Sequence, residues 1–200
     1  DPEMSRGLGD VYKRQIKDTY RTFGFSSMET PCVEHIENLC SKQGGDNEKL
    51  IFKILKRGEK LKLDTAKEEM DLVDGGLRYD LTVPLSRYYA NNASVLPSPF
   101  KALQMGNVWR ADRPQRGRFR QFMQCDIDIL GEPSNLAEIE LILATTTLLG
   151  KLDFKNFTIR INDRKILKAM AAYSGFEEKD YDTAVSYTHL RAHETSQDLV

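Results

Sequence analysis

Two strand-like runs joined by an arginine-rich loop constrain the fold of this chain more than any other feature. Residues 100–111 and 118–131 flank the loop DRPQRG at 112–117. Their spacing predicts an antiparallel hairpin, with Pro114 and Gly117 in a flexible connection. Alternation with period two in the second run predicts one polar face and one apolar core face. The polar face holds Phe122, Gln124, Asp126 and Asp128, and the apolar face holds Met123, Cys125, Ile127 and Ile129.

The rest of the chain alternates helical and extended patterns, which predicts an α+β domain with an antiparallel sheet and packed helices. The expected helices cover residues 16–24, 82–92, 135–152 and 163–176, with Thr82 and Asp163 as N-caps and Gly24 and Gly175 as stops. The expected extended segments cover residues 26–35, 77–81 and 157–162, and residues 49–63 as strand, turn and strand. Residues 64–76 are expected to form a charged surface excursion or short helix that ends in Gly75 and Gly76.

Composition excludes several classes of protein. The 29 basic and 30 acidic side chains give a net charge of -1, so a nucleic-acid contact requires a local basic patch. No apolar run approaches the roughly 20 residues of a membrane span. The three cysteines, Cys32, Cys40 and Cys125, lack Cys-x-x-Cys spacing, which argues against a disulfide framework or a zinc site. A reducing compartment, most simply the cytoplasm, is expected, and no metal ligand set is assigned.

The two ends read differently from the middle. Residues 1–15 and 185–200 show no periodicity, and GLGDVYKRQ and SYTHLRAHET resemble peptides translated from sequencing-adapter DNA. We therefore expect both ends to be non-native tails around a native segment at residues 16–184. On that interpretation His35 is the native histidine, which makes a metal site built on histidine unexpected.

The hairpin loop is the candidate anion site. Guanidinium groups stay charged and grip two phosphate oxygens with fixed geometry. Beside them, the carboxylates and amide of the polar face are suited to a zwitterionic ligand next to a polyphosphate. Two other interpretations remain open on the residues alone: a solvated sheet face with salt bridges, and a loop that grips RNA phosphates without sequence preference. The arginines are Arg110, Arg113, Arg116, Arg118 and Arg120.

The run WRADRPQRGRFRQFMQCD resembles the second signature motif of class II aminoacyl-tRNA synthetases. Together with the upstream LRYDLTVPLSRY, it resembles the histidyl-tRNA synthetases more narrowly. FGFSSMETPCVE resembles the first class II motif, whose proline would be Pro31. The resemblance spans residues 16–184 and implies an incomplete class II catalytic core, because the third motif, a later histidine-specific segment and the anticodon-binding domain are absent. A polypeptide of this extent is expected to be inactive or nearly so.

The resemblance also implies a role for each matching residue. Arg110 would hold the ATP α-phosphate and the histidine carboxylate as the catalytic residue, Asp112 would place the adenine, Arg118 would reach the γ-phosphate, and Phe122 would stack on the adenine. The segment Asp80, Leu81 and Thr82, together with Gln124, would receive the histidine α-amino group, and Asp128 would address the imidazole. Thr82 as an N-cap and Asp80 near a helix start have purely structural explanations as well.

The implied activity is that of a histidine-tRNA ligase, which forms histidyl-adenylate from histidine and ATP and transfers histidine to the 3' end of tRNA(His). Magnesium would bridge the phosphates, and a homodimer in the cytoplasm is implied. The alternative is the non-catalytic regulatory subunit of ATP phosphoribosyltransferase, which resembles the same fold. That regulator would have less need of Arg118 and Phe122, because it does not activate histidine.

Overall fold

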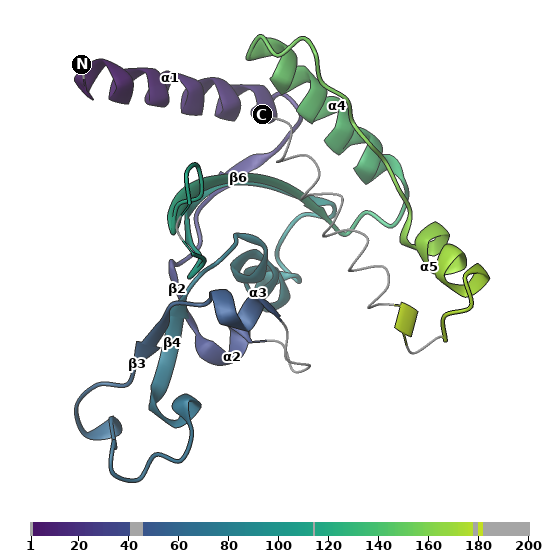
Figure 1. Ribbon diagram of the computed structural model, residues 1–200. Coiled ribbons are helices and arrows are strands. Elements are labelled where there is room, and N and C mark those ends of the chain that lie inside the picture. The colour runs from purple at the N-terminus through teal and green to yellow at the C-terminus, as the bar shows by residue number, and fades with distance from the viewer. Residues whose placement is uncertain (1, 41–45, 114, 178–179, 182–200) are drawn as a thin grey trace. The chain divides into compact units, whose positions relative to one another are not determined.

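The computed structural model describes residues 2–40, 46–113, 115–177 and 180–181 (Figure 1). It divides into two units, residues 1–155 and 156–200. The helices are α1 (Pro2–Arg21), α2 (Ile36–Leu39), α3 (Thr82–Asn92), α4 (Leu136–Lys151) and α5 (Arg164–Tyr173), with 3-10 turns at Asp46–Leu50, Gly58–Lys60 and Glu69–Leu72. The strands are β1 (Ser26–Met28), β2 (Val33–His35), β3 (Lys53–Leu55), β4 (Val73–Leu77), β5 (Phe100–Trp109) and β6 (Gln121–Leu130). Among the described helices, none has the length and apolar character needed to cross a membrane.

The larger sheet of the first unit has the order β1-β5-β6. Strands β5 and β6 pair antiparallel in unbroken register from Phe100 opposite Leu130 to Trp109 opposite Gln121. The predicted hairpin and the α+β class are therefore confirmed. Strand β1 adds a short parallel neighbour to β5, with Ser27 opposite Leu103.

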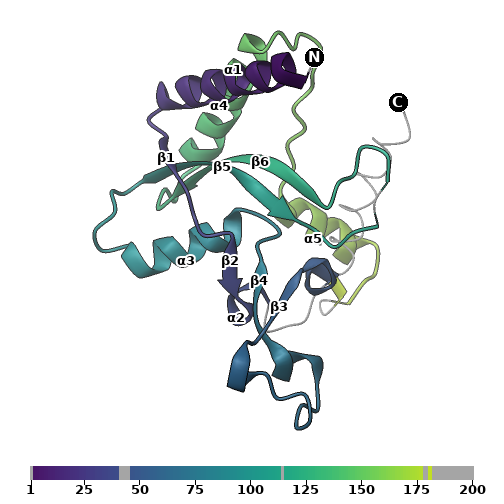
Figure 2. The same ribbon diagram turned by 90° about the vertical axis from the view of Figure 1, so that its left-hand side faces the viewer.

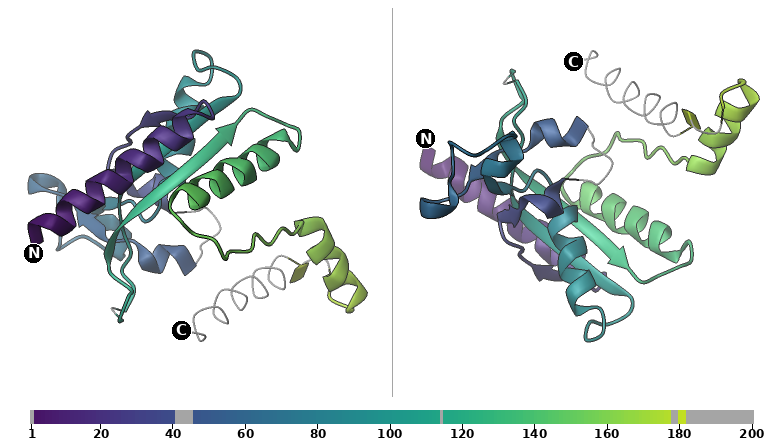
Figure 3. Two further views of the ribbon diagram at one scale, coloured as in Figure 1. Left: turned by 90° about the horizontal axis from the view of Figure 1, so that it is seen from above. Right: turned by 90° about the horizontal axis from the view of Figure 1, so that it is seen from below.

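Strand β5 lies between two helical layers, as its consecutive residues Ala102 and Leu103 show. Successive side chains of a strand point to opposite faces, and both of these are 0% exposed. On the Leu103 face, Tyr20, Ala144 and Leu148 of α1 and α4 complete one core cluster. On the Ala102 face, Leu85 of α3 packs with Phe100 and Ala102 in a second core cluster. Figures 2 and 3 show α1 and α4 side by side on one face of the hairpin and α3 on the opposite face.

The smaller sheet has the order β2-β4-β3 and is antiparallel throughout. The prediction for Gly75 and Gly76 was wrong, because both lie inside β4 and do not end a surface excursion. A Cβ on Gly76 would lie 2.7 Å from Ile51 Cγ2 and 2.8 Å from Leu39 Cδ1, so close packing explains this glycine. The strand predicted at residues 77–81 is not formed beyond its first residue, because β4 ends at Leu77.

The second strand predicted within residues 49–63 is also absent. The chain makes β3 and then a 3-10 turn at Gly58–Lys60, and residues 61–63 form no strand. Strand β3 pairs instead with β4, which lies about twenty residues further along the chain. Local alternation had indicated extended structure correctly at Lys53–Leu55 but could not identify the partner.

Helix α1 begins at Pro2, although the sequence predicted a helix only from Ile16. Residues 9–15 continue it with side chains that are exposed or half-buried, so no apolar stripe marked them in the sequence. Gln15 Nε2 donates to the Lys151 carbonyl oxygen at 2.9 Å, which ties the helix to the end of α4. The helix ends as predicted, before Gly24 at φ +80°. A helical conformation does not decide whether residues 1–15 are native, so their exclusion stays a prediction; residues 185–200 lie outside the described part.

In the second unit, α5 begins and ends as predicted. Asp163 Oδ1 accepts the Lys165 N–H at 2.8 Å, and Gly175 follows the helix at φ +84°. The strand predicted at residues 157–162 is not formed. A strand needs a neighbour for its backbone groups, and the described residues of this unit contain no other strand.

Candidate ligand-binding site on the hairpin

The loop between β4 and α3, residues 78–81, is held in place by hydrogen bonds to its backbone carbonyl groups. Three of its carbonyl oxygens accept hydrogen bonds from β5 or the residue after it. The pairs are Trp109 N to Arg78 O at 3.0 Å, Arg110 Nε to Tyr79 O at 3.1 Å, and Gln104 Nε2 to Leu81 O at 3.0 Å. The loop is therefore positioned by the same hairpin that carries the other candidate residues.

Asp80 caps α3, and the predicted N-cap Thr82 does not. The Asp80 Oδ1 atom accepts the Val83 N–H at 3.1 Å, while Thr82 is the exposed first residue of the helix. A carboxylate at this end of the helix also meets the positive end of the helix dipole. The side chain that holds the start of α3 is therefore that of Asp80, and Thr82 remains exposed beside the site.

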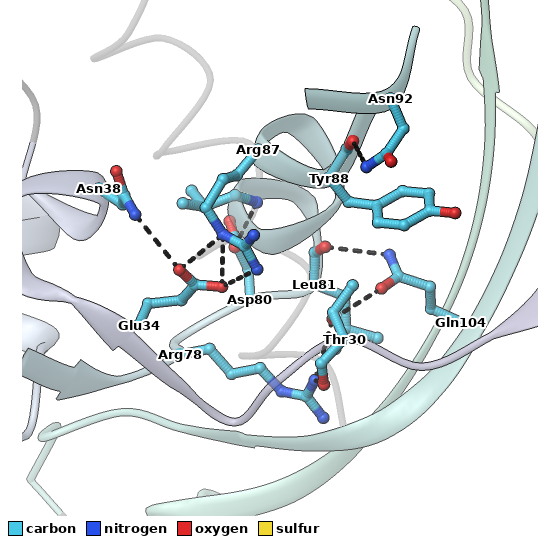
Figure 4. A network of polar contacts seen from close by, with 11 residues as sticks. Thr30, Glu34, Asn38, Arg78, Asp80, Leu81, Arg87, Tyr88, Asn92 and Gln104 are labelled. Carbon is cyan, nitrogen blue, oxygen red and sulfur yellow. Dashed lines mark hydrogen bonds and ion pairs between the residues drawn. The ribbon is translucent and has the colours of Figure 1, made fainter. Parts of the chain in front are cut away.

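Arg78 organises a buried polar network beneath this loop (Figure 4). Its Nη1 donates to the Thr30 carbonyl oxygen at 2.6 Å and to Thr30 Oγ1 at 3.1 Å, and its Nε donates to the Asn107 carbonyl oxygen at 2.9 Å. Thr30 Oγ1 donates in turn to Gln104 Oε1 at 3.0 Å. Arg78, Thr30 and Gln104 are 5%, 8% and 1% exposed. The network joins the segment between β1 and β2 to β5, and sequence reasoning missed it.

The other side of α3 is anchored to β2 by an ion pair. Arg87 Nε and Nη2 approach the two Glu34 carboxylate oxygens at 2.7 to 3.0 Å, and Asn38 Nδ2 donates to Glu34 Oε2 at 3.4 Å (Figure 4). The Glu34 side chain is 3% exposed. This bond raises the pKa of the Arg87 guanidinium above its ordinary value.

The polar face of β6 gathers acidic groups opposite this loop. Burial raises the pKa of Asp126 and of Asp128, and the negative charge of Asp80 adds to both shifts. Gln124 Nε2 donates to Asp126 Oδ2 at 3.3 Å. Within the described part of the chain, the buried side-chain oxygens without a hydrogen-bond partner are Gln124 Oε1 and Asp128 Oδ2. Buried polar atoms are normally paired, so this face is built to accept donors from a ligand.

Arg110 lies at the end of β5, between the acidic row and the hairpin loop. Its guanidinium carbon lies 5.1 Å from the centre of the Phe122 ring, and its positive charge opposes the rise in the pKa of Asp126. The structure thus brings the Arg110 guanidinium and the Phe122 ring together. Guanidinium stacking on an aromatic ring restricts the orientation of the charged group.

The remaining candidates lie on the loop itself. Arg118 Nε approaches Asp112 Oδ2 at 3.4 Å, and the Arg118 side chain is 58% exposed. Gln115 and Arg118 exchange backbone hydrogen bonds around Gly117, whose φ of +78° favours glycine. The loop therefore presents Arg118 beside Asp112.

Asp126 is the residue on the polar face of β6 to which the sequence analysis assigned no role. The alternation of the sequence had nevertheless placed Asp126 on that face.

Comparison with known proteins identifies the family of this chain. The sequence matches the family model described as histidyl-tRNA synthetase over residues 8–199. The chain belongs to the histidyl-tRNA synthetase family. The histidine-tRNA ligase of Leifsonia xyli subsp. xyli is 48% identical over 176 residues, which are 85% of this chain and 40% of that protein. The crystal structure of histidyl-tRNA synthetase from Nostoc sp. PCC 7120 matches with a TM-score of 0.69 and 29% identity, covering 89% of this chain and 36% of that one.

The chain thus spans about two fifths of the length of the Leifsonia relative. A structure titled as an ATP phosphoribosyltransferase regulatory subunit/histidyl-tRNA synthetase from Bacillus halodurans C matches with a TM-score of 0.59. At 17% identity, over 88% of this chain and 50% of that one, it shows a shared fold alone.

Proposed function

We propose that this chain belongs to a histidine-tRNA ligase and carries the surface on which histidine is activated by ATP. The complete protein would then transfer histidine from histidyl-adenylate to the 3' end of tRNA(His). Family membership supports this proposal, and the observation that carries it is the pair of unpaired acceptors, Gln124 Oε1 and Asp128 Oδ2, on one face of β6.

These two acceptors suit the two nitrogen-bearing ends of histidine. Gln124 and Asp128 are four residues apart on one strand, so their Cα atoms are separated by about 13 Å along it. If the Gln124 and Asp128 side chains lean toward each other, their oxygens can both reach one ligand that has a hydrogen-bond donor at each end. We assign the α-ammonium to Gln124 and Asp80, with the segment Asp80, Leu81 and Thr82 lining that end, and an imidazole N–H to Asp128. The Leu81 carbonyl already accepts from Gln104, so it contributes chiefly by fixing the segment.

The phosphates would lie toward the hairpin loop. Arg110, held by the Tyr79 carbonyl oxygen and stacked on Phe122, would grip the α-phosphate and the histidine carboxylate. Adenine would stack on the face of Phe122 opposite to Arg110, with Asp112 placing it. Arg118 would reach the γ-phosphate after leaving Asp112, and its exposure makes that exchange inexpensive in free energy.

The chemical step needs positioning and charge stabilisation rather than a covalent enzyme intermediate. A carboxylate oxygen of histidine attacks the α-phosphorus, the new O–P bond forms, and pyrophosphate leaves with the electrons of the broken P–O bond. Arg110 stabilises the charge that builds on the α-phosphate, an effect commonly worth several kcal/mol in preorganised sites.

Magnesium belongs with the phosphates in this proposal. In the described ranges, His, Cys, Asp and Glu side chains do not gather in a group of three that would hold a metal ion. We therefore assign no residue of this chain to magnesium, which would neutralise phosphate charge when ATP is bound. A homodimer and a cytoplasmic location are further proposals that rest on the family.

Histidine-dependent exchange of pyrophosphate into ATP by the complete gene product tests the proposal. Gln124→Ala and Asp128→Ala should each lower the exchange rate at least tenfold. Glu138→Gln, an exposed change in the first turn of α4, is the matched control and should have no effect. Exchange that does not depend on histidine, or that both site variants leave unchanged, would exclude the assignment.

The regulatory-subunit alternative predicts a different result in the same experiment. It requires calorimetric binding of histidine together with no exchange of pyrophosphate. The position of Arg110 over the Phe122 ring favours the ligase, because the proposed handling of ATP uses both side chains.

A further inference from the structure

Asp126 lies between Gln124 and Asp128 on the same face of β6, and the roles assigned above leave it without a function. It stands directly opposite the buried Gln104 of β5 in the sheet register. Its Oδ2 atom accepts a hydrogen bond from Gln124 Nε2 at 3.3 Å. The ligand-facing amide of Gln124 is therefore held by a neighbouring carboxylate on its own strand.

The chemistry of this bond determines which atom of the amide is left for a ligand. An ionised carboxylate has acceptors only, whereas a glutamine amide has a donor end and an acceptor end. Asp126 therefore draws the NH2 group of Gln124 toward itself and turns Oε1 away. That oxygen is buried and has no partner in the described part of the chain. A glutamine free to rotate would present either end to a ligand.

We propose that Asp126 is a positioning residue, which orients the Gln124 amide so that its oxygen meets the ammonium group of the ligand. The inference rests on the proposed histidine-binding function and extends it. Asp126 acts through Gln124 and thereby sets a preference for ligands that carry an amine. Replacing the acceptor at position 126 releases the amide and removes this preference.

The groups around Asp126 act on its pKa in opposite directions, and the net effect is to raise it. Burial and the charge of Asp80 raise the pKa of Asp126, while the bond from Gln124 and the charge of Arg110 lower it. Asp128 lies two residues further along the same face, and Asp126 in turn raises the pKa of Asp128. A bound ammonium adds positive charge to this row and strengthens the ionised state that orients the amide.

Two ligands separate amide positioning from general damage to the site. Histamine carries the imidazole and the amine of histidine, whereas 3-(imidazol-4-yl)propionate carries the imidazole without the amine. Calorimetry on the complete gene product should show that Asp126→Leu weakens histamine binding about tenfold, on the scale of one hydrogen bond to a charged group. Binding of the propionate should stay within twofold, and thermal melting identifies any variant that fails to fold.

Two further variants test whether Asp126 acts through Gln124. In a Gln124→Ala background, Asp126→Leu should cause no additional loss of histamine affinity, because the amide it orients is gone. Asp126→Asn can accept from Gln124 Nε2 but can also donate to Gln124 Oε1, so it should restore only part of the affinity lost in Asp126→Leu. If charge attraction were the whole effect, Asp126→Asn would lose as much as Asp126→Leu.

The inference is overturned by an equal loss for both ligands, by an undiminished loss in the Gln124→Ala background, or by an Asp126→Asn variant as weak as Asp126→Leu. These results leave the proposed function standing if the unaltered protein binds histidine. Failure of the unaltered protein to bind histidine or histamine overturns the proposed function itself, and this inference with it.

Discussion

Gly106 of β5 provides the space that the Arg78 guanidinium occupies. A Cβ atom built on Gly106 would overlap Arg78 Nη2, and Leu81 Cδ2 lies 3.7 Å from the same point. Arg78 reaches this position from the end of β4 and donates to Thr30 and Asn107. The absence of one side chain on β5 therefore permits the network that fastens the loop before α3.

Gly106→Ala should lower the free energy of unfolding by about 1 to 3 kcal/mol, because the added methyl group forces a buried guanidinium from its partners. Urea unfolding followed by circular dichroism measures the change. Gly150→Ala in α4 is the matched control, since a Cβ there meets nothing within 4 Å. That change should be neutral or stabilising by up to about 1 kcal/mol. Equal stability of the two variants would contradict the packing argument.

The Glu34 and Arg87 pair should couple strongly in a double-mutant cycle. Arg87→Met leaves the Glu34 carboxylate, which is 3% exposed, without its cation and should cost about 2 to 4 kcal/mol. Adding Glu34→Leu should recover part of that loss, because the unpaired charge is then removed. The exposed pair Asp153 and Lys155 serves as the comparison, with an expected coupling below about 0.5 kcal/mol. Additive losses at Glu34 and Arg87 would contradict this prediction.

Asp128→Asn should stabilise the free protein at pH 7 while it weakens histidine binding. The pKa of Asp128 is raised in the fold, so its ionised form is disfavoured there relative to the unfolded chain. Stability from this group is full below the unfolded pKa and declines as pH rises through the folded pKa. The variant should be more stable than the original protein at pH 7 and no more stable near pH 3, where the carboxyl group is protonated in both states. Denaturant midpoints at both pH values check the sign.

Arg110→Lys should lower pyrophosphate exchange by about 100- to 1000-fold, the range seen when one preorganised donor is lost. A lysine keeps the charge but lacks the planar guanidinium that can bind two oxygens at once. Arg113→Lys, an exposed change in the same loop, should stay within twofold of the original rate. An Arg110→Lys variant that keeps the original exchange rate would indicate that the charge at position 110, rather than the geometry of the guanidinium, drives catalysis.

The elements that the sequence predicted correctly are those whose signals are local. The hairpin followed from alternation, and α5 followed from Asp163 and Gly175 at its ends. The strand predicted at 157–162 had the same kind of alternation, but it has no neighbour in the described part of its unit. Alternation identifies the faces of a possible strand, whereas its formation depends on a partner elsewhere in the chain.

The candidate site also combines residues that local sequence motifs point to with residues that only the fold brings together. Motif resemblance suggested roles for Arg110, Gln124 and Asp128, which lie in one continuous run, and these roles stay predictions. The support beneath them was invisible, because Thr30 lies 48 residues from Arg78 and 74 residues from Gln104 in the chain. Even the helix cap was assigned two residues too late, since both Asp80 and Thr82 are suitable capping types and only the fold selects between them.

The unbroken register of β5 and β6 also determines how this hairpin can change length. A residue inserted in the loop around Gly117 leaves the pairing of both strands intact. A residue inserted early in β6 reverses every later side chain, so the acidic row would turn toward α1 and α4 while Ile127 and Ile129 would turn toward the opposite face of the sheet. Insertions and deletions among proteins that share this site should therefore collect in the turn and be missing from the strands.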